Sequence, residues 1–332
     1  MKKFDVYGVC NPLIDLLCHI PDEFLQQWDL EKNRMYLVST DRQHSILKEL
    51  ENRSLKIEHA AGGSGANTMI GIAQLGGHSA FTGKIGFDPR GDQYRNDLED
   101  KGVKTALGAG EGMTGSSLIL VSNDASRTMN THLGMCQELE PDDIDENVLS
   151  SSSILYITGF LWDTESQKAS VRHALEMAEN LPVKVALSLS DPFCVERHHQ
   201  DFNELIRSRV DLLFCNQEEA FTMMETQVTH EALAGLSENV EIVVMTLGNR
   251  GSLICNQGQV FYIDPIEVEV VDTTGAGDAY AAGFLYGYSH DHSIMNCGRI
   301  ASVMAGTVIE QIGPRIETAS MKTLKERLSN IP

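Results

Sequence analysis

The sequence predicts an α/β fold in which helices pack on a mostly parallel sheet, with a small β-rich subdomain inserted at one edge. Two observations predict it. Buried-strand patterns alternate with amphipathic helical patterns along most of the 332 residues, and two segments interrupt this alternation. Strands separated by helices indicate βαβ units, whose strands run parallel. A chain of this length fits two domains or one larger α/β unit.

Short apolar runs, rich in β-branched residues, mark the expected strands. They cover residues 4–10, 79–85, 154–158, 183–189, 210–215 and 242–247. Amphipathic stretches mark the expected helices at residues 66–75, 91–100 and 165–180. Because most of these strands and helices alternate along the chain, the strands are expected to pair in parallel.

The two interruptions, at residues 21–60 and 105–132, predict the small subdomain. The second contains a hairpin, with strands at 116–121 and 127–132 joined by a polar turn. Both segments are expected to form a lid inserted at one edge of the sheet. The expected division is a core of residues 1–15, 61–104 and 133–332 and a β-rich lid of residues 16–60 and 105–132.

Composition excludes several classes of function. The 47 acidic residues outnumber the 26 basic ones, for a net charge of −21, and no local basic patch offsets this, so nucleic acid is not an expected partner. No apolar run approaches the ~20 residues of a membrane helix, and the start of the chain is too polar for a signal peptide. The seven cysteines are scattered without a C-x-x-C pair, as in a reduced cytoplasmic protein.

The most specific motif lies at residues 270–284, with the sequence VVDTTGAGDAYAAGF. A β-branched run ends at Asp272, a turn of small residues follows (Gly275, Ala276 and Gly277), and a helix is expected from Asp278. Backbone N–H groups of such a turn bind a phosphate or a developing anion. A carboxylate beside them can accept the proton of an alcohol that attacks a phosphoryl group. The alternative is that Asp278 only caps the helix.

A second glycine cluster opens the helix expected at residues 66–75. It does not fit a dinucleotide fingerprint, because Thr68 stands where the third glycine belongs. The backbone amides of Gly62 and Gly63 and the side chain of Asn67 suit vicinal hydroxyls, as in a polyol site. Tight packing of the helix on a strand is an equally good explanation of these glycines.

Two pairs of polar residues follow expected strands. Asn11 and Asp15 come after the first strand, at the carboxyl edge where α/β proteins bind ligands, and Asp15 suits two sugar hydroxyls or a turn. Asn216 and Glu219 have the spacing of a helix capping box. Their functional interpretation places Asn216 near nucleotide phosphates and Glu219 near a magnesium-bound water.

These motifs, in this order, resemble the PfkB family of carbohydrate and nucleoside kinases, also called ribokinase-like, over nearly the whole chain. The C-terminal signature matches residues 272–278, and the N-terminal one matches Gly62, Gly63 and Asn67 with the glycines at 76 and 77. Further matches are the N-x-x-E motif at residues 216–219 and the nucleotide-site segment with Thr246, Gly248 and Gly251. The adenosine kinase branch is the most similar, on residues 11–15, 127–133, 159–162, 189–194 and 311–315.

The resemblance implies a ribokinase-like three-layer α/β/α sandwich with a small β-rich lid. It also implies ATP-dependent transfer to a primary hydroxyl, with Mg²⁺ and, more weakly, K⁺. The expected substrate is a small molecule, first of all adenosine, which becomes AMP, and the expected state is a monomer or homodimer. A sugar kinase with a ribose- or fructose-type acceptor is the alternative. A non-catalytic nucleoside-binding protein is less expected, since Asp278 and the turn are present.

The resemblance also assigns roles to residues. Asp278 is the base, the amides of Gly275, Ala276 and Gly277 form the anion hole, and Arg127 closes over the transferring phosphate from the lid. The acceptor site comprises Asn11, Asp15, Gly62, Gly63 and Asn67, with Phe160 near the nucleobase. The nucleotide site comprises Asn216, Thr246, Gly248, Gly251 and Ser302, the last standing where relatives often place Asn or His near adenine. Glu219 is expected at Mg²⁺ through water, and Asp272 and Thr274 at K⁺.

Overall fold

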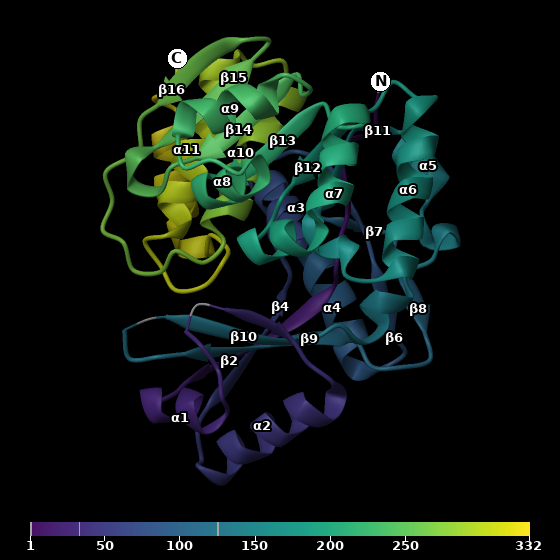
Figure 1. Cartoon of the computed structure of the whole chain (residues 1–332), viewed down its shortest axis with the longest axis vertical. Coiled ribbons are helices and arrows are strands. Elements are labelled where there is room, and N and C mark those ends of the chain that lie inside the picture. The colour runs from purple at the N-terminus through teal and green to yellow at the C-terminus, as the bar shows by residue number, and fades with distance from the viewer. Residues whose placement is uncertain (1, 33, 125) are drawn as a thin grey trace.

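A nine-stranded sheet forms the centre of the protein in a computed structural model that describes residues 2–32, 34–124 and 126–332 (Figure 1). Its spatial order is β16-β15-β14-β13-β12-β11-β1-β5-β7. The strands are β1 (Phe4–Val9), β5 (Ser79–Thr82), β7 (Lys104–Thr105), β11 (Ser152–Thr158), β12 (Lys184–Ser188), β13 (Leu212–Asn216), β14 (Ile242–Thr246), β15 (Ser252–Asn256) and β16 (Gln259–Ile263). Pairing is parallel from β7 to β14 and antiparallel for β15 and β16.

Helices cover both faces of this sheet. Successive side chains of a strand point to opposite faces, so each strand contributes residues to two hydrophobic cores. In β11, Ile154 and Tyr156 pack into one core, while Leu155 and Ile157 pack into the other. The first core holds α3 (Ser64–Gln74), α4 (Pro89–Asp100), α10 (Ala276–Ser289), α11 (Ile294–Val308) and α12 (Met321–Leu328). The second holds α5 (Glu146–Ser150), α6 (Glu165–Glu179), α7 (Pro192–Ser208), α8 (Gln217–Met224) and α9 (Thr229–Ser237). The expected three-layer α/β/α sandwich is confirmed.

A second sheet of five strands lies apart from the central sheet (Figure 1). Its order is β3-β10-β9-β2-β4, from β2 (Leu13–His19), β3 (Met35–Leu37), β4 (Ile57–Gly62), β9 (Gly115–Val121) and β10 (Arg127–His132). The expected hairpin is confirmed as β9 and β10, which pair Val121 with Arg127 and Ser116 with His132. Two helices, α1 (Asp22–Gln27) and α2 (Thr40–Asn52), belong to the same part of the chain, so this lid is not built of strands alone.

The small sheet begins and ends a few residues away from the expected boundaries. β2 already starts at Leu13 and β4 continues to Gly62, so Asp15 lies in the lid sheet rather than in the core. The alternation of buried residues at 14, 16 and 18 accounts for β2, since it turns one face of the strand inward. On the other side, residues 105–110 stay with the core, through β7 and through a two-stranded sheet of β6 (Lys84–Gly86) and β8 (Gly108–Gly110).

Short 3₁₀ turns complete the chain at Gly134–Glu138, Pro141–Asp143, Gly159–Trp162, Gly248–Arg250 and Thr318–Ser320. Within the part of the chain that the structure describes, no helix has the length and apolar character needed to cross a bilayer.

Candidate active site

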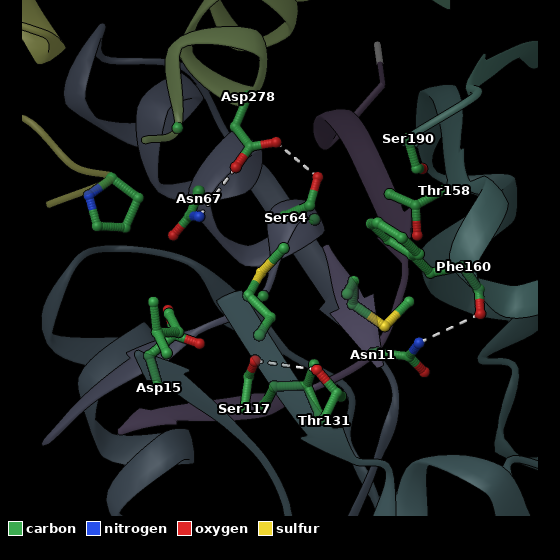
Figure 2. Close-up of a pocket in the computed structure, with 18 of the residues that line it drawn as sticks. Asn11, Asp15, Ser64, Asn67, Ser117, Thr131, Thr158, Phe160, Ser190 and Asp278 are labelled. Atoms are coloured by element: carbon green, nitrogen blue, oxygen red, sulfur yellow. Dashed lines mark hydrogen bonds between the residues drawn. The ribbon is translucent and has the colours of Figure 1, made fainter. Parts of the chain in front are cut away.

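A cavity of about 310 Å³ lies between the carboxyl ends of the central strands and the lid sheet (Figure 2). Its lining residues come from the end of β1, from strands β2, β3, β9 and β10, from the starts of α3 and α10, from the turns after β11 and β12, and from Pro314. A second pocket of about 270 Å³ adjoins it, and Ser64, Ser190, Gly275 and Asp278 line both. Asp278 therefore stands where the two pockets meet.

The two glycine motifs converge on Asp278 (Figure 2). Its Oδ1 accepts a hydrogen bond from the Ser64 hydroxyl at 2.5 Å, and its Oδ2 accepts one from Asn67 Nδ2 at 2.9 Å. Burial raises the pKa of Asp278, and these two donors oppose that rise. The bonds that hold the carboxylate come from the side chains of α3, so helix capping does not account for this residue.

The turn at the start of α10 holds the three residues expected to form an anion site, Gly275, Ala276 and Gly277. Gly275 takes a left-handed φ of 72°, and a Cβ there would lie 2.5 Å from the Pro314 carbonyl oxygen, so only glycine fits. The first N–H groups of a helix have no partner within the helix and point toward its N-terminal end. One of the three expected donors, the N–H of Ala276, makes a long bond of 3.3 Å to the Thr273 carbonyl.

Asp15 lies on the wall of the larger cavity that belongs to the lid. Its carboxyl group packs over Gly62, where a Cβ would come within 2.1 Å of it, so Gly62 is needed to make room. Burial raises the pKa of Asp15 to about 7, and the positive charges of Arg315 and Arg127 oppose the rise. Among the residues that the structure describes, no group hydrogen-bonds to this carboxylate, which leaves it available to a ligand.

Asn11 is held in place at the opposite wall. Its Oδ1 accepts a hydrogen bond from Gln167 Nε2 at 2.6 Å, and its Nδ2 donates to the carbonyl oxygen of Phe160 at 3.4 Å (Figure 2). Gly63 has φ 89° and lies against the Asn11 carbonyl, where a Cβ would approach to 2.6 Å. The fold thus brings Asn11, Gly63 and Phe160, three residues of the expected acceptor site, into the lining of one cavity.

Arg127 reaches from β10 to the loop before α10 and forms an ion pair with Asp272. Asp272 also accepts hydrogen bonds from the N–H and hydroxyl of Thr274 and from the N–H of Gly313. Burial opposes ionisation of Asp272, yet these donors and Arg127 hold its pKa below the usual value. Arg127 therefore links the lid to the loop before α10, and both oxygens of Asp272 are engaged.

The second pocket contains part of the expected nucleotide site. Asn216, Glu219 and Thr246 line it together with the turn at the start of α10. The capping box is confirmed: Glu219 N donates to Asn216 Oδ1 at 2.8 Å, and Asn216 N donates to Glu219 Oε2 at 3.0 Å. Glu219 is only 5% exposed, and this burial raises its pKa to about 7.

Three expected nucleotide residues lie outside the lining of that pocket. The buried hydroxyl of Ser302, on α11, donates to the Asp264 carbonyl at 2.9 Å. Gly248 and Gly251 shape the turn between β14 and β15, with φ 63° and 79°. These three residues stay predictions as nucleotide contacts.

Sequence reasoning missed several residues of the cavity. Ser64 lies next to Gly63 in the second glycine cluster, so its position was available from the sequence, whereas Gln167, which supports Asn11 from outside the cavity lining, carries no local signal. Ser117 and Thr131 face each other across β9 and β10 with their hydroxyls 3.0 Å apart (Figure 2). An apolar wall was also missed, made of Leu13, Met35, Leu37, Ile119, Met129 and Leu133.

Known proteins resemble this chain over nearly its full length. The family of pfkB carbohydrate kinases matches residues 31–320. The solved structure of adenosine kinase from Sinorhizobium meliloti is 36% identical, with a TM-score of 0.90 over 98% of this chain and 99% of that chain. A probable sugar kinase from Rhizobium etli CFN 42 is also 36% identical, with a TM-score of 0.91 and the same coverage. The 5-dehydro-2-deoxygluconokinase of Listeria monocytogenes is 30% identical over 75% of this chain and 81% of that protein.

These similarities agree with the architecture. The expected ribokinase-like fold is confirmed, and so is the class of reaction, phosphoryl transfer to an alcohol group. The chain belongs to the pfkB family of carbohydrate kinases, as a phosphotransferase of its adenosine kinase-like branch.

Proposed function

We propose that this kinase transfers the terminal phosphoryl group of ATP to the 5′-hydroxyl of a ribonucleoside, adenosine in the first place. The apolar wall of the acceptor cavity carries this proposal. Met35, Ile119 and Met129 extend it from the lid, and Phe160 lies across the cavity from the lid residues Ser117 and Thr131 (Figure 2). A flat purine base would bury such a surface, whereas a free sugar presents hydroxyls on every side.

The polar end of the same cavity suits the ribose. The available Asp15 carboxylate would accept hydrogen bonds from two ribose hydroxyls, and Gly63 lets the backbone approach the sugar. Asn67 would contribute its amide from the start of α3. A ribose held in this way would direct its primary hydroxyl toward Asp278 and the turn.

Asp278 would then accept the proton of that hydroxyl as it attacks phosphorus. Ser64 and Asn67 hold the carboxylate in one orientation, which the reaction needs at the moment of transfer. The N–H groups of residues 275–277 would stabilise the charge that develops on the phosphoryl oxygens. Arg127 would move from Asp272 to the transferring group as the lid closes and excludes water.

The second pocket would hold the phosphates of ATP. Glu219 and Asn216 offer carboxylate and amide oxygens, the donors that Mg²⁺ prefers, and Glu219 would hold the metal through water. Mg²⁺ bound there would neutralise charge on the phosphates. Asp272 and Thr274 likewise offer oxygens to K⁺, and the ion pair with Arg127 implies that Arg127 leaves when this site fills.

A sugar acceptor is the second candidate, and the hydroxyls of Ser117 and Thr131 on the cavity wall favour it, because they offer a sugar two polar partners. A cytoplasmic location and a monomeric or homodimeric state stay predictions from the sequence.

An acceptor panel tests the assignment. The purified protein with Mg-ATP and K⁺ should phosphorylate adenosine, with the phosphate on the 5′-oxygen, and should turn over ribose and fructose far more slowly. 5′-Deoxyadenosine is the matched control: it should bind as a competitive inhibitor and yield no product. Rapid turnover of ribose or fructose with adenosine untouched would rule out the nucleoside assignment.

A further inference from the structure

The segment of residues 311–316 carries a motif to which the sequence assigns no role, yet it lies against the catalytic turn. The N–H of Gly313 donates to Asp272 Oδ2 at 2.8 Å. Pro314 fills the space beside Gly275, the residue that starts the anion turn. Both contacts fix the backbone of this segment next to the reacting groups, so the side chain that follows Pro314 begins close to the site.

That side chain belongs to Arg315, and one residue, Asn67, connects it to Asp278. Arg315 Nε donates to Asn67 Oδ1 at 3.0 Å, and Asn67 Nδ2 donates to Asp278 Oδ2 at 2.9 Å. On its other side, Arg315 Nη1 forms an ion pair with Asp97 of α4 at 2.6 Å. The four side chains form a continuous line from Asp97 to Asp278.

The bond from Arg315 decides which way the Asn67 amide faces. An amide has an acceptor oxygen on one side and two donor hydrogens on the other. A guanidinium group can only donate, so it requires Oδ1 of Asn67 on its own side and turns Nδ2 toward Asp278. With the opposite orientation, Asn67 would present an oxygen to the carboxylate and repel it.

The charge of Arg315 acts on the same group. The side chain is 16% exposed, so its field is only partly screened by water. Burial raises the pKa values of Asp15 and Asp278, and the Arg315 charge lowers both. The Arg315 guanidinium, which also pairs with Asp97, thus favours the ionised form of two carboxylates that line the same cavity.

We propose that Arg315 is a positioning residue for phosphoryl transfer, which orients Asp278 through Asn67 and balances the charge of the two cavity carboxylates. The proposal rests on the proposed function, because that function makes Asp278 the base. Arg315 itself is not among the residues that line the cavity, so it acts through Asn67 and through its field.

The pKa of Asp278 depends on the titratable and charged groups around it. Among the residues that the structure describes, the titratable and charged side chains that interact with Asp278 or line a pocket with it are Cys10, Asp15, Tyr156, Asp163, Cys215, Glu219, Tyr280 and Arg315. Burial raises the pKa of Cys10 to about 12 and that of Tyr156 far above its usual value, so both stay neutral near pH 7. Burial also raises the pKa of Cys215 and of Tyr280, so the groups that remain from this set are Asp15, Asp163, Glu219 and Arg315, of which Arg315 alone is positive.

The test compares Arg315→Gln and Arg315→Lys with wild type in the full chain. Arg315→Gln should lower kcat on the order of 10- to 100-fold, as expected when a reacting group is misplaced. It should also move the acid limb of the kcat/KM profile to higher pH by about one unit, because a positive charge near the base is lost. The loss of kcat/KM in Arg315→Gln, relative to wild type, is therefore largest near pH 6 and becomes smaller toward pH 9.

Two variants separate charge from geometry. Arg315→Lys keeps the charge without the planar donor, so the acid limb should return to its wild-type position while kcat stays low. Arg327→Gln is the matched control: Arg327 forms an equally short ion pair with Glu310, 2.5 Å, but has no link to Asn67, and neither kcat nor the limb should change.

A readout without turnover distinguishes this proposal from the proposed function. The ¹³C-carboxyl resonance of Asp278, identified by its absence in Asp278→Asn, should titrate about one pH unit higher in Arg315→Gln. An unchanged titration and an unchanged acid limb in a folded variant would overturn the role of Arg315. If Arg315→Gln does not fold, a wild-type kcat in Arg315→Lys would overturn it instead. A wild-type protein that phosphorylates no nucleoside overturns the function, and the titration still tests Arg315.

Discussion

The Asp278 carboxylate accepts one hydrogen bond on each oxygen, and this fixes what its amide variant should do. In Asp278→Asn the side chain keeps its size and one acceptor oxygen, and the Ser64 hydroxyl can turn to accept from the new NH₂ group. The melting temperature should therefore stay close to that of wild type. The variant cannot accept the proton of the substrate hydroxyl, so kcat should fall on the order of 10²- to 10⁴-fold. A normal melting curve with more than about a tenth of wild-type kcat would exclude Asp278 as the base.

Asp15 makes substrate binding depend on pH. Its pKa of about 7 means that the carboxylate form, which accepts the ribose hydroxyls, becomes dominant only as pH rises through neutrality. Calorimetry without ATP should find adenosine bound about tenfold more tightly at pH 8 than at pH 6, the ratio of the ionised fractions. Asp15→Asn should bind weakly at both pH values. A Kd for wild type that is constant from pH 6 to 8 would contradict this role.

The raised pKa of Asp15 also makes the stability of the folded protein depend on pH. The folded state holds the Asp15 proton more tightly than the unfolded chain does, so the contribution of this group to stability falls as pH rises from about 4 to 7. A carboxyl group buried in this way without a hydrogen-bonding partner among the described residues is typical of a binding site.

At the scale of elements, the hairpin of β9 and β10 connects the lid to the loop before α10. Arg127 stands at the start of β10, and its ion pair with Asp272 crosses from the lid to the loop before α10. A charge that engages the phosphoryl group mainly in the transition state acts on rate rather than on binding. Arg127→Ala should therefore lower kcat more than it weakens adenosine binding, as measured by steady-state kinetics beside calorimetry. Equal loss of binding with kcat unchanged would refute the assigned role.

Elements whose defining contacts lie close together in sequence could be predicted from the sequence. Asn216 and Glu219 form the capping box that their three-residue spacing indicates, because both partners of that motif lie in one turn of chain. The hairpin of residues 116–132 was predictable for the same reason. By contrast, β2 and the antiparallel pair β15–β16 were not expected, since their assignment depends on which distant strands they meet.

At the scale of the whole molecule, the site combines groups that are far apart in sequence. Asp278, Asn67 and Asp15 could be named beforehand because each lies in a motif whose residue types match its chemistry. Arg315 could not be assigned a role, because its bond to Asn67 spans 248 positions and exists only in the folded chain. The apolar wall was missed for a similar reason: Ile119 and Met129 look like ordinary strand residues until the lid faces the core.

The cavity proposed for the acceptor is lined by residues of both the lid sheet and the central part of the protein, so a ligand that fills it should stabilise the contact between them. Adenosine at about 100 times its Kd would add roughly 2.7 kcal/mol to the free energy of unfolding. With an unfolding entropy of about 2.1 cal/mol/K per residue over this chain, that corresponds to a rise in Tm of about 4 °C. Ribose at the same concentration would contact the Asp15 end alone and should leave Tm nearly unchanged.

Ile119→Asp places a charge in the apolar wall, so it should abolish the shift with adenosine while Asp278 and its partners remain in place. Differential scanning calorimetry with both ligands checks this, and equal shifts with ribose and adenosine would show that the apolar wall does not recognise a base.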